Sequence, residues 1–159
     1  MRALYALACV LALAACASAP QSQPPQAKAT RQVSEGAADN AAGYAAKMIG
    51  KPYHFGGSSP TAGFDCSGLV RYGFKQAGVS VPHNTEKQRQ ASRPVKLAEL
   101  RRGDLLFFDQ EGKKNSHVGI YLGRGMFVHA PSSGKTVRSD RLEAPFWKKH
   151  LSEARRVAV

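Results

Sequence analysis

The order of hydrophobic patterns along the chain constrains its fold most. Apolar residues recur at helical spacing in residues 37–49 and again in residues 65–77, and Thr85 and Gln88 have the spacing of a capping box that opens a short helix over 85–91. The second half changes to short apolar or alternating runs, which are typical of strands. These runs are residues 104–108, 118–122 and 126–130, with weaker ones at 136–139 and 154–159. Helices followed by strands predict an α+β fold with helices packed on an antiparallel sheet.

The length and charge limit the classes of function. With 159 residues and 43% hydrophobic residues, the chain has enough material for one folded domain. Its 23 Lys and Arg outnumber 11 Asp and Glu, giving a net charge of +12 that suits an anionic partner or simply keeps a small protein in solution. The basic residues are scattered, and neither an RNA-binding aromatic motif nor zinc-finger spacing occurs. We therefore expect no nucleic-acid partner.

The N-terminus has the pattern of an export signal. Arg2 precedes an apolar run over residues 3–15, which is too short for a membrane span of about 20 residues. The run ends in Leu13-Ala14-Ala15-Cys16, which resembles the lipobox of bacterial lipoproteins, where the cysteine receives lipid and becomes the mature N-terminus. A plain secretory signal is the alternative, but it leaves Cys16 unexplained. Because Ala17 rather than Asp follows the cysteine, we expect an outer-membrane lipoprotein that faces the periplasm.

The domain organisation follows from this signal. Residues 1–15 are predicted to be the lipoprotein signal peptide. Residues 16–36 are rich in Pro and Gln and poor in large aliphatic side chains, so we expect a lipid-anchored flexible tether there. Residues 37–159 form the predicted folded domain.

Cys66 is the single thiol that this organisation leaves in the domain, because Cys9 departs with the signal and Cys16 receives lipid. It stands at the predicted start of a helix, where unpaired N–H groups and the helix dipole favour an anion and lower a thiol pKa. Asp65 is placed to cap that helix, and Gly68 allows another backbone to approach. The alternative is an inert buried cysteine.

Two histidines share a predicted hairpin. If its turn is centred on Arg124, His129 lies opposite Gly119 and His117 lies one diagonal step away on the same face. A one-residue change of register would separate the two imidazoles. With Cys66, they form a candidate set of nucleophile, base and orienting group. A metal site is less favoured, because the chain lacks a closely spaced pair of ligands.

Five short motifs stand in a fixed order along the domain. They are Tyr53-His54-Phe55-Gly56-Gly57, Phe64-Asp65-Cys66-Ser67-Gly68-Leu69-Val70, Arg102-Gly103-Asp104-Leu105-Leu106-Phe107-Phe108, Ser116-His117-Val118-Gly119-Ile120-Tyr121-Leu122-Gly123 and Val128-His129-Ala130. Together they resemble the NlpC-type cell-wall cysteine peptidases, and within these the small lipoprotein murein endopeptidases of the MepS-like (Spr-like) group. One departure is His83, which follows Pro82 where members of that family commonly carry Arg.

The resemblance implies a papain-like fold and hydrolysis of peptide bonds in peptidoglycan. Its site residues, carried over by motif, are Cys66 as nucleophile, His117 as base, His129 as the group that orients the base, Tyr53 as a donor to the oxyanion, and Asp65 and Ser67 beside the substrate. It implies no metal or cofactor, peptidoglycan as partner and the membrane reached through the lipid anchor. We expect a monomer, although the sequence itself does not determine the oligomeric state.

Several alternatives stay open from sequence alone. The site could belong to a catalytically inactive peptidoglycan-binding lipoprotein, or to an amidase acting on N-acetylmuramoyl peptides. For an endopeptidase, the cleaved bond could be γ-D-Glu–diaminopimelate or D-Ala–diaminopimelate. The sequence identifies no regulator.

Overall fold

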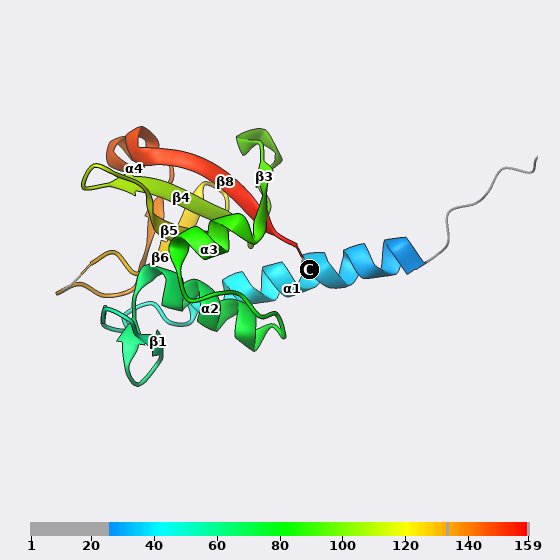
Figure 1. Ribbon diagram of the computed structural model, residues 1–159, viewed down its shortest axis with the longest axis horizontal. Helices are drawn as coiled ribbons and strands as arrows, with labels where there is room; N and C mark the ends of the chain where they lie inside the picture. Colours follow the sequence, from blue (N-terminus) through cyan, green and yellow to red (C-terminus); the bar gives the residue numbers. More distant parts are fainter. Residues whose placement is uncertain (1–25, 133, 159) are drawn as a thin grey trace, which may run out of the picture.

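Six antiparallel strands form one sheet in the order β3-β8-β4-β5-β6-β7, and β1 and β2 form a separate pair (Figure 1). The computed structural model describes residues 26–132 and 134–158. The helices are α1 Gln26–Ala46, α2 Cys66–Gln76, α3 Thr85–Gln90 and α4 Pro145–His150, with a short 3-10 helix at Leu97–Glu99. The strands are β1 Ser58–Ser59, β2 Gly63–Phe64, β3 Ser92–Val95, β4 Leu105–Gln110, β5 Lys113–Gly123, β6 Met126–His129, β7 Arg138–Arg141 and β8 Leu151–Val157.

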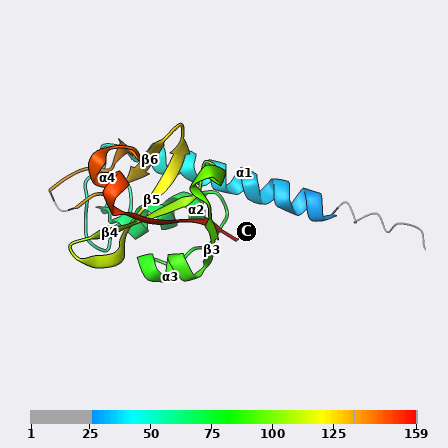
Figure 2. The ribbon, with the colours of Figure 1, turned by 90° about the horizontal axis from the view of Figure 1, so that it is seen from above.

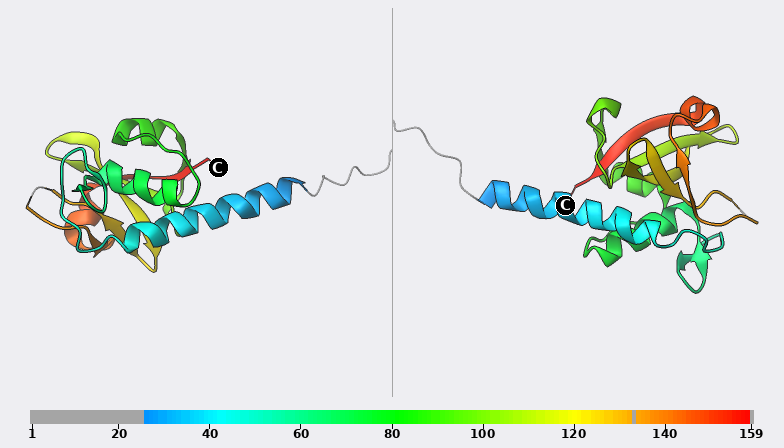
Figure 3. Two further views of the ribbon diagram at one scale, coloured as in Figure 1. Left: turned by 90° about the horizontal axis from the view of Figure 1, so that it is seen from below. Right: turned by 180° about the vertical axis from the view of Figure 1, so that it is seen from behind.

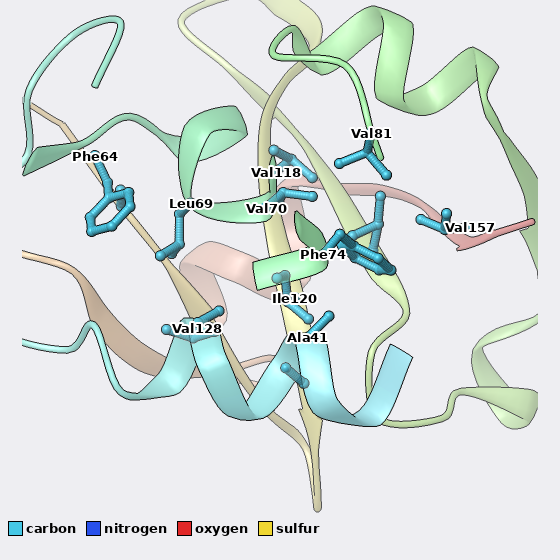
Figure 4. Close-up of a cluster of buried hydrophobic side chains, with 14 of the residues drawn as sticks. Ala41, Phe64, Leu69, Val70, Phe74, Val81, Val118, Ile120, Val128 and Val157 are labelled. Carbon is cyan, nitrogen blue, oxygen red and sulfur yellow. The ribbon is translucent and has the colours of Figure 1, made fainter. Parts of the chain in front are cut away.

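Both faces of the sheet are buried at its central strand β4. Successive residues of a strand point to opposite faces. In β4, Leu105 and Phe107 therefore join the core under α1 and α2, whereas Leu106 and Phe108 join a second cluster with Trp147 of α4. Figure 4 shows the first core between the two long helices and the sheet, and Figure 2 shows the sheet and its helices from above. This burial explains why β4 is a continuous apolar run. The α+β prediction is confirmed.

Helix α1 begins at Gln26, so the predicted tether is wrong for residues 26–36. The prolines that suggested a linker end at Pro25, and the following residues are mainly good helix formers such as Ala, Gln, Lys and Arg. Figure 3 shows the first turns of α1 extending away from the sheet, while its later turns pack beside α2. The helix also ends earlier than predicted, at Ala46 rather than Ile49. The signal peptide, Cys16 and the tether up to residue 25 lie outside the described residues.

The two shorter helices differ in how well their starts were predicted. Helix α2 begins at Cys66, with Asp65 as its cap, as expected. Helix α3 begins at Thr85, but Asn84 caps it by accepting a hydrogen bond from the Lys87 N–H at 3.0 Å. Gln88 turns inward instead of completing a capping box, because its amide donates to the carbonyl groups of Ser67 and Pro82. None of the helices in the described ranges is long and apolar enough to span a membrane.

The β5–β6 hairpin has the predicted register. Ile120 pairs with Val128 and Tyr121 with Phe127, and a bulge lies between Tyr121 and Gly123 at the turn. This register directs Val118 and Ile120 into the helix-covered core. The alternate residues of both strands therefore face the second cluster.

Candidate active site

The first turn of α2 holds Cys66 against strand β5. Its sulfur lies 3.8 Å from Thr85 Oγ1 and accepts hydrogen bonds from the backbone N–H groups of Val118 and Ser67. Burial raises the pKa of the thiol, and the charge of Asp65 raises it further, although the hydrogen bonds from Val118 and Thr85 act in the opposite direction. The expectation of a thiolate in the free protein is therefore corrected: desolvation outweighs the helix start and favours the neutral thiol.

The Asp65 carboxylate fixes the backbone around Cys66. It accepts hydrogen bonds from Gly68 N at 2.6 Å, Ser67 Oγ at 3.0 Å and Gly56 N at 2.9 Å, and His83 Nε2 lies 3.1 Å from it. Gly68 also lets the loop before the helix approach, because a Cβ at this position would collide with the carbonyl oxygen of Gly57. The predicted close approach at Gly68 is confirmed. His83, the departure from the family pattern, thus pairs with the capping carboxylate.

A cleft of about 610 Å³ opens over Cys66, within the size range of ligand pockets. It brings together the predicted residues Tyr53, Asp65, Cys66 and Ser67. Its other lining residues are Phe55, Gly56, His83, Asn84, Thr85, Glu86, Lys113, Lys114, Asn115 and Ser116. Burial raises the pKa of Tyr53, and the charge of Asp65 acts in the same direction, so its hydroxyl keeps its proton and can donate a hydrogen bond into the cleft.

The two imidazoles meet as the hairpin predicted. His117 Nε2 lies 2.9 Å from His129 Nδ1, and both side chains are buried. Burial lowers the pKa of His117 to about 3, and the neighbouring His129 adds to this shift. Burial also lowers the pKa of His129 to about 4, although Asp140 acts against it. Both rings are therefore neutral near neutral pH.

Strand β5 links the cysteine to the imidazole pair, because it carries His117 and also contacts the sulfur of Cys66 through its backbone. The sulfur of Cys66 contacts Val118, the residue after His117. Among the described residues, the His117 ring is not a hydrogen-bond partner of the sulfur. Hydrogen bonds between catalytic groups are often long or poorly aligned before substrate binds, so the absence of this bond does not exclude His117 as the base. Within the described ranges, His, Cys, Asp and Glu side chains form no group of three able to hold a metal ion.

Asp140 and Trp147 are neighbours of the imidazole pair that sequence reasoning missed. Asp140 Oδ2 lies 3.0 Å from His129 Nε2 and accepts a hydrogen bond from Trp147 Nε1 at 2.9 Å. The indole stacks on His117, with ring centroids 5.7 Å apart, and meets His129 edge-on at 4.7 Å. The register of β6 with β7 is the signal that finds Asp140, since it pairs His129 with Arg138 and puts Asp140 one step along the same face.

Sequence comparison now identifies the domain. The profile of the NlpC/P60 family matches residues 50–156. The chain belongs to the NlpC/P60 family. Two relatives from Escherichia coli K12 are similar: murein DD-endopeptidase MepH is 41% identical over 116 residues, and probable endopeptidase YafL is 43% identical over 115 residues. Each alignment covers 70% of this chain but only 42% of MepH and 46% of YafL, so the chain spans less than half the length of these relatives.

A solved structure agrees with the family assignment. A lipoprotein-like NLP/P60 family protein from Staphylococcus aureus superposes with a TM-score of 0.69 at 36% identity, covering 78% of this chain and 42% of that one. The chain therefore has the α+β, papain-like fold of the NlpC/P60 family, as the motifs predicted. The reaction roles of Cys66, His117 and His129 stay predictions.

Proposed function

We propose that this chain is a peptidoglycan endopeptidase that hydrolyses peptide bonds in murein stem peptides or crosslinks by a Cys-His-His mechanism. The observation that supports this most is the buried 2.9 Å contact between His117 and His129, beside a cysteine that opens into a cleft. The named activities of MepH and YafL point to the same reaction class. No cofactor is required by this chemistry.

The reaction begins with a proton transfer. His117 is neutral because burial lowers its pKa to about 3, so it can accept the thiol proton of Cys66. The sulfur then forms a bond to the carbonyl carbon of the stem peptide, and the carbonyl oxygen becomes an oxyanion. Because burial raises the pKa of the thiol, this transfer occurs in the substrate complex rather than in the free protein.

The remaining steps return the site to its starting state. Backbone N–H groups at the start of α2, together with the Tyr53 hydroxyl, stabilise the oxyanion. Protonated His117 donates its proton to the leaving amine as the peptide C–N bond breaks. Neutral His117 then takes a proton from the water that attacks the acyl-enzyme, the C–S bond breaks, and His117 returns that proton to the sulfur of Cys66. His129 orients His117 through the contact between their rings.

The charge of the cleft suits this polymer. Lys113 and Lys114 line one wall, and the chain carries a net charge of +12. Stem peptides carry carboxylates, so these lysines give favourable electrostatic contacts at the site. Carboxylates lie beside both the γ-D-Glu–diaminopimelate bond and the D-Ala–diaminopimelate bond, so this charge argument does not distinguish the two.

The location of the enzyme is a separate proposal. The lipobox supports cleavage after residue 15, lipid attachment at Cys16 and an outer-membrane position facing the periplasm. Helix α1 begins ten positions after Cys16, at Gln26. The helix would therefore hold the catalytic domain away from the membrane, with a rise of about 1.5 Å per helical residue. We also propose that the enzyme acts as a monomer.

Digestion of purified peptidoglycan, with the products identified by mass spectrometry, tests the function. We expect new stem-peptide fragments, which identify the bond, and loss of activity in Cys66→Ala. His129→Ala should slow the reaction less than His117→Ala, because His117 handles the proton itself, and His150→Ala, outside the cleft, is the control. Release of intact stems from the glycan would indicate an amidase. Binding without products would indicate an inactive binding lipoprotein.

A further inference from the structure

The Asp140 carboxylate gathers three side chains on the face of the sheet opposite α1 and α2. Besides His129 and Trp147, Arg138 donates to Asp140 Oδ2 through Nε at 3.0 Å and Nη2 at 2.9 Å. Burial acts to raise the pKa of Asp140, but the hydrogen bonds from His129 and Arg138 outweigh it and leave the pKa lowered. Asp140 is therefore ionised near neutral pH.

An ionised carboxylate determines where the hydrogen of His129 lies. A carboxylate only accepts hydrogen bonds, so His129 Nε2 must carry the hydrogen in its 3.0 Å contact with Asp140. A neutral imidazole holds one hydrogen, so His129 Nδ1 has a free lone pair.

The same reasoning extends to the catalytic base. His129 Nδ1 faces His117 Nε2 at 2.9 Å and can only accept, so His117 Nε2 must donate. The hydrogen of neutral His117 is thereby assigned to Nε2, and its Nδ1 is left as an unprotonated base. The opposite tautomer of His117 would place a hydrogen on Nδ1, which is the ring nitrogen left to accept the thiol proton in the proposed mechanism because Nε2 contacts His129.

We propose that Asp140 is a positioning residue that fixes the tautomers of His129 and His117 and so keeps Nδ1 of His117 free to take the proton of Cys66. This positioning role in catalysis rests on the proposed function. When His117 becomes positively charged during the reaction, the same chain of contacts places the negative carboxylate behind the imidazole pair. Asp140 touches neither the substrate nor the sulfur, and it acts through His129.

Trp147 gives this arrangement its rigidity. The indole donates to the same oxygen that receives His129 Nε2, and its ring lies against both imidazoles. Rotation of the carboxylate away from His129 would therefore also break its hydrogen bond with the buried Trp147. A purely structural role, in which Asp140 only anchors Trp147 and Arg138, is the competing explanation.

Histidine tautomers distinguish these explanations. In the full chain labelled with ¹⁵N-histidine, the nitrogen chemical shifts identify which ring nitrogens carry hydrogen. We expect protonated Nε2 and unprotonated Nδ1 for both His129 and His117. In Asp140→Asn, the amide can donate to His129 Nε2, so we expect a second tautomer and a fall in peptidoglycan hydrolysis of at least about tenfold. The wrong tautomer of a catalytic histidine costs about 10⁴-fold in a Ser-His-Asp triad, and Asp140 acts one ring further from the reaction. Glu143→Gln, which removes an exposed carboxylate paired with Lys148, should change neither measurement.

The outcomes separate the proposal from the proposed function. Unchanged tautomers in Asp140→Asn would overturn the proposal, whether or not activity falls. If that variant does not fold, the unmodified chain still decides, because Nδ1-protonated His129 or His117 would overturn the proposal by itself. Altered tautomers in Asp140→Asn, with an unmodified protein that leaves peptidoglycan intact, would refute the proposed function and leave the positioning role standing.

Discussion

The buried imidazole pair predicts that the protein loses stability in mild acid. His117 and His129 have ordinary pKa values of 6.5 when the chain is unfolded, but their pKa values are about 3 and about 4 in the folded protein. Between these limits the unfolded chain binds more protons than the folded chain. The free energy of unfolding therefore falls as the pH decreases below about 6.5, by about 1.4 kcal/mol per pH unit for each histidine.

The size of this effect follows from the two shifts. At about pH 5 both folded imidazoles are still mainly neutral, while both unfolded ones are protonated. Each histidine then lowers the free energy of unfolding by about 2 kcal/mol relative to neutral pH, and the pair by about 4 kcal/mol. This is a large share of the roughly 5–15 kcal/mol that stabilises a typical domain. The lowered pKa of Asp140 acts in the same direction only in stronger acid, below its ordinary value of 3.8.

Urea unfolding followed by circular dichroism at about pH 7.5 and pH 5 measures this loss. A double variant with His117→Asn and His129→Asn should lose most of the pH dependence, whatever its stability at neutral pH. His54→Asn, at an exposed loop position, is the matched control and should keep it. If the double variant kept the full pH dependence, or the unmodified protein were equally stable at both pH values, the imidazole pair could not be neutral and buried as described.

Three further experiments, one on the unmodified protein and two on variants, test other parts of the structure. Alkylation of Cys66 by iodoacetamide should show a pH inflection above the ordinary thiol pKa of 9.0, because burial raises it, and an inflection below about 7.5 would restore the thiolate expectation. Gly119→Ala should reduce hydrolysis at least tenfold, because the new Cβ would lie 2.7 Å from Phe127 and 3.3 Å from the Cβ of His129 and would displace the imidazole. Unchanged activity would show that the hairpin accommodates the methyl group without moving His129. Cys16→Ser should abolish labelling with palmitate and release the protein from the outer membrane, whereas continued labelling would contradict the lipobox.

Much of the site could be predicted because its geometry is local. Gly123, Arg124 and Gly125 mark the hairpin turn, and the paired positions on either side determine which residues share a face. This was enough to bring His117 and His129 together without knowing the rest of the sheet. The start of α2 at Cys66 was predictable for the same reason, since a capping Asp65 and a terminal Gly78 lie close in sequence.

The missed features depend on longer-range packing or on weak local patterns. Strand β7 has the sequence Arg-Ser-Asp-Arg, without hydrophobic alternation, and its predicted range of 136–139 excluded Asp140. Helix α4 spans only Pro145–His150, which is too short to show helical periodicity. The raised pKa of Cys66 depends on how deeply the finished fold buries the sulfur, and no local motif encodes that depth.

Trp147 is the single tryptophan of the chain, and this gives the unmodified protein a built-in optical reporter. Indole emission responds to nearby charge, and this indole lies against both imidazoles and hydrogen-bonds the carboxylate behind them. A proton arriving on either ring should therefore change the emission of one fluorophore whose position is known. Rapid mixing with soluble stem peptides could then follow proton transfer and acyl-enzyme breakdown in a single turnover, with neither a label nor a chromogenic substrate.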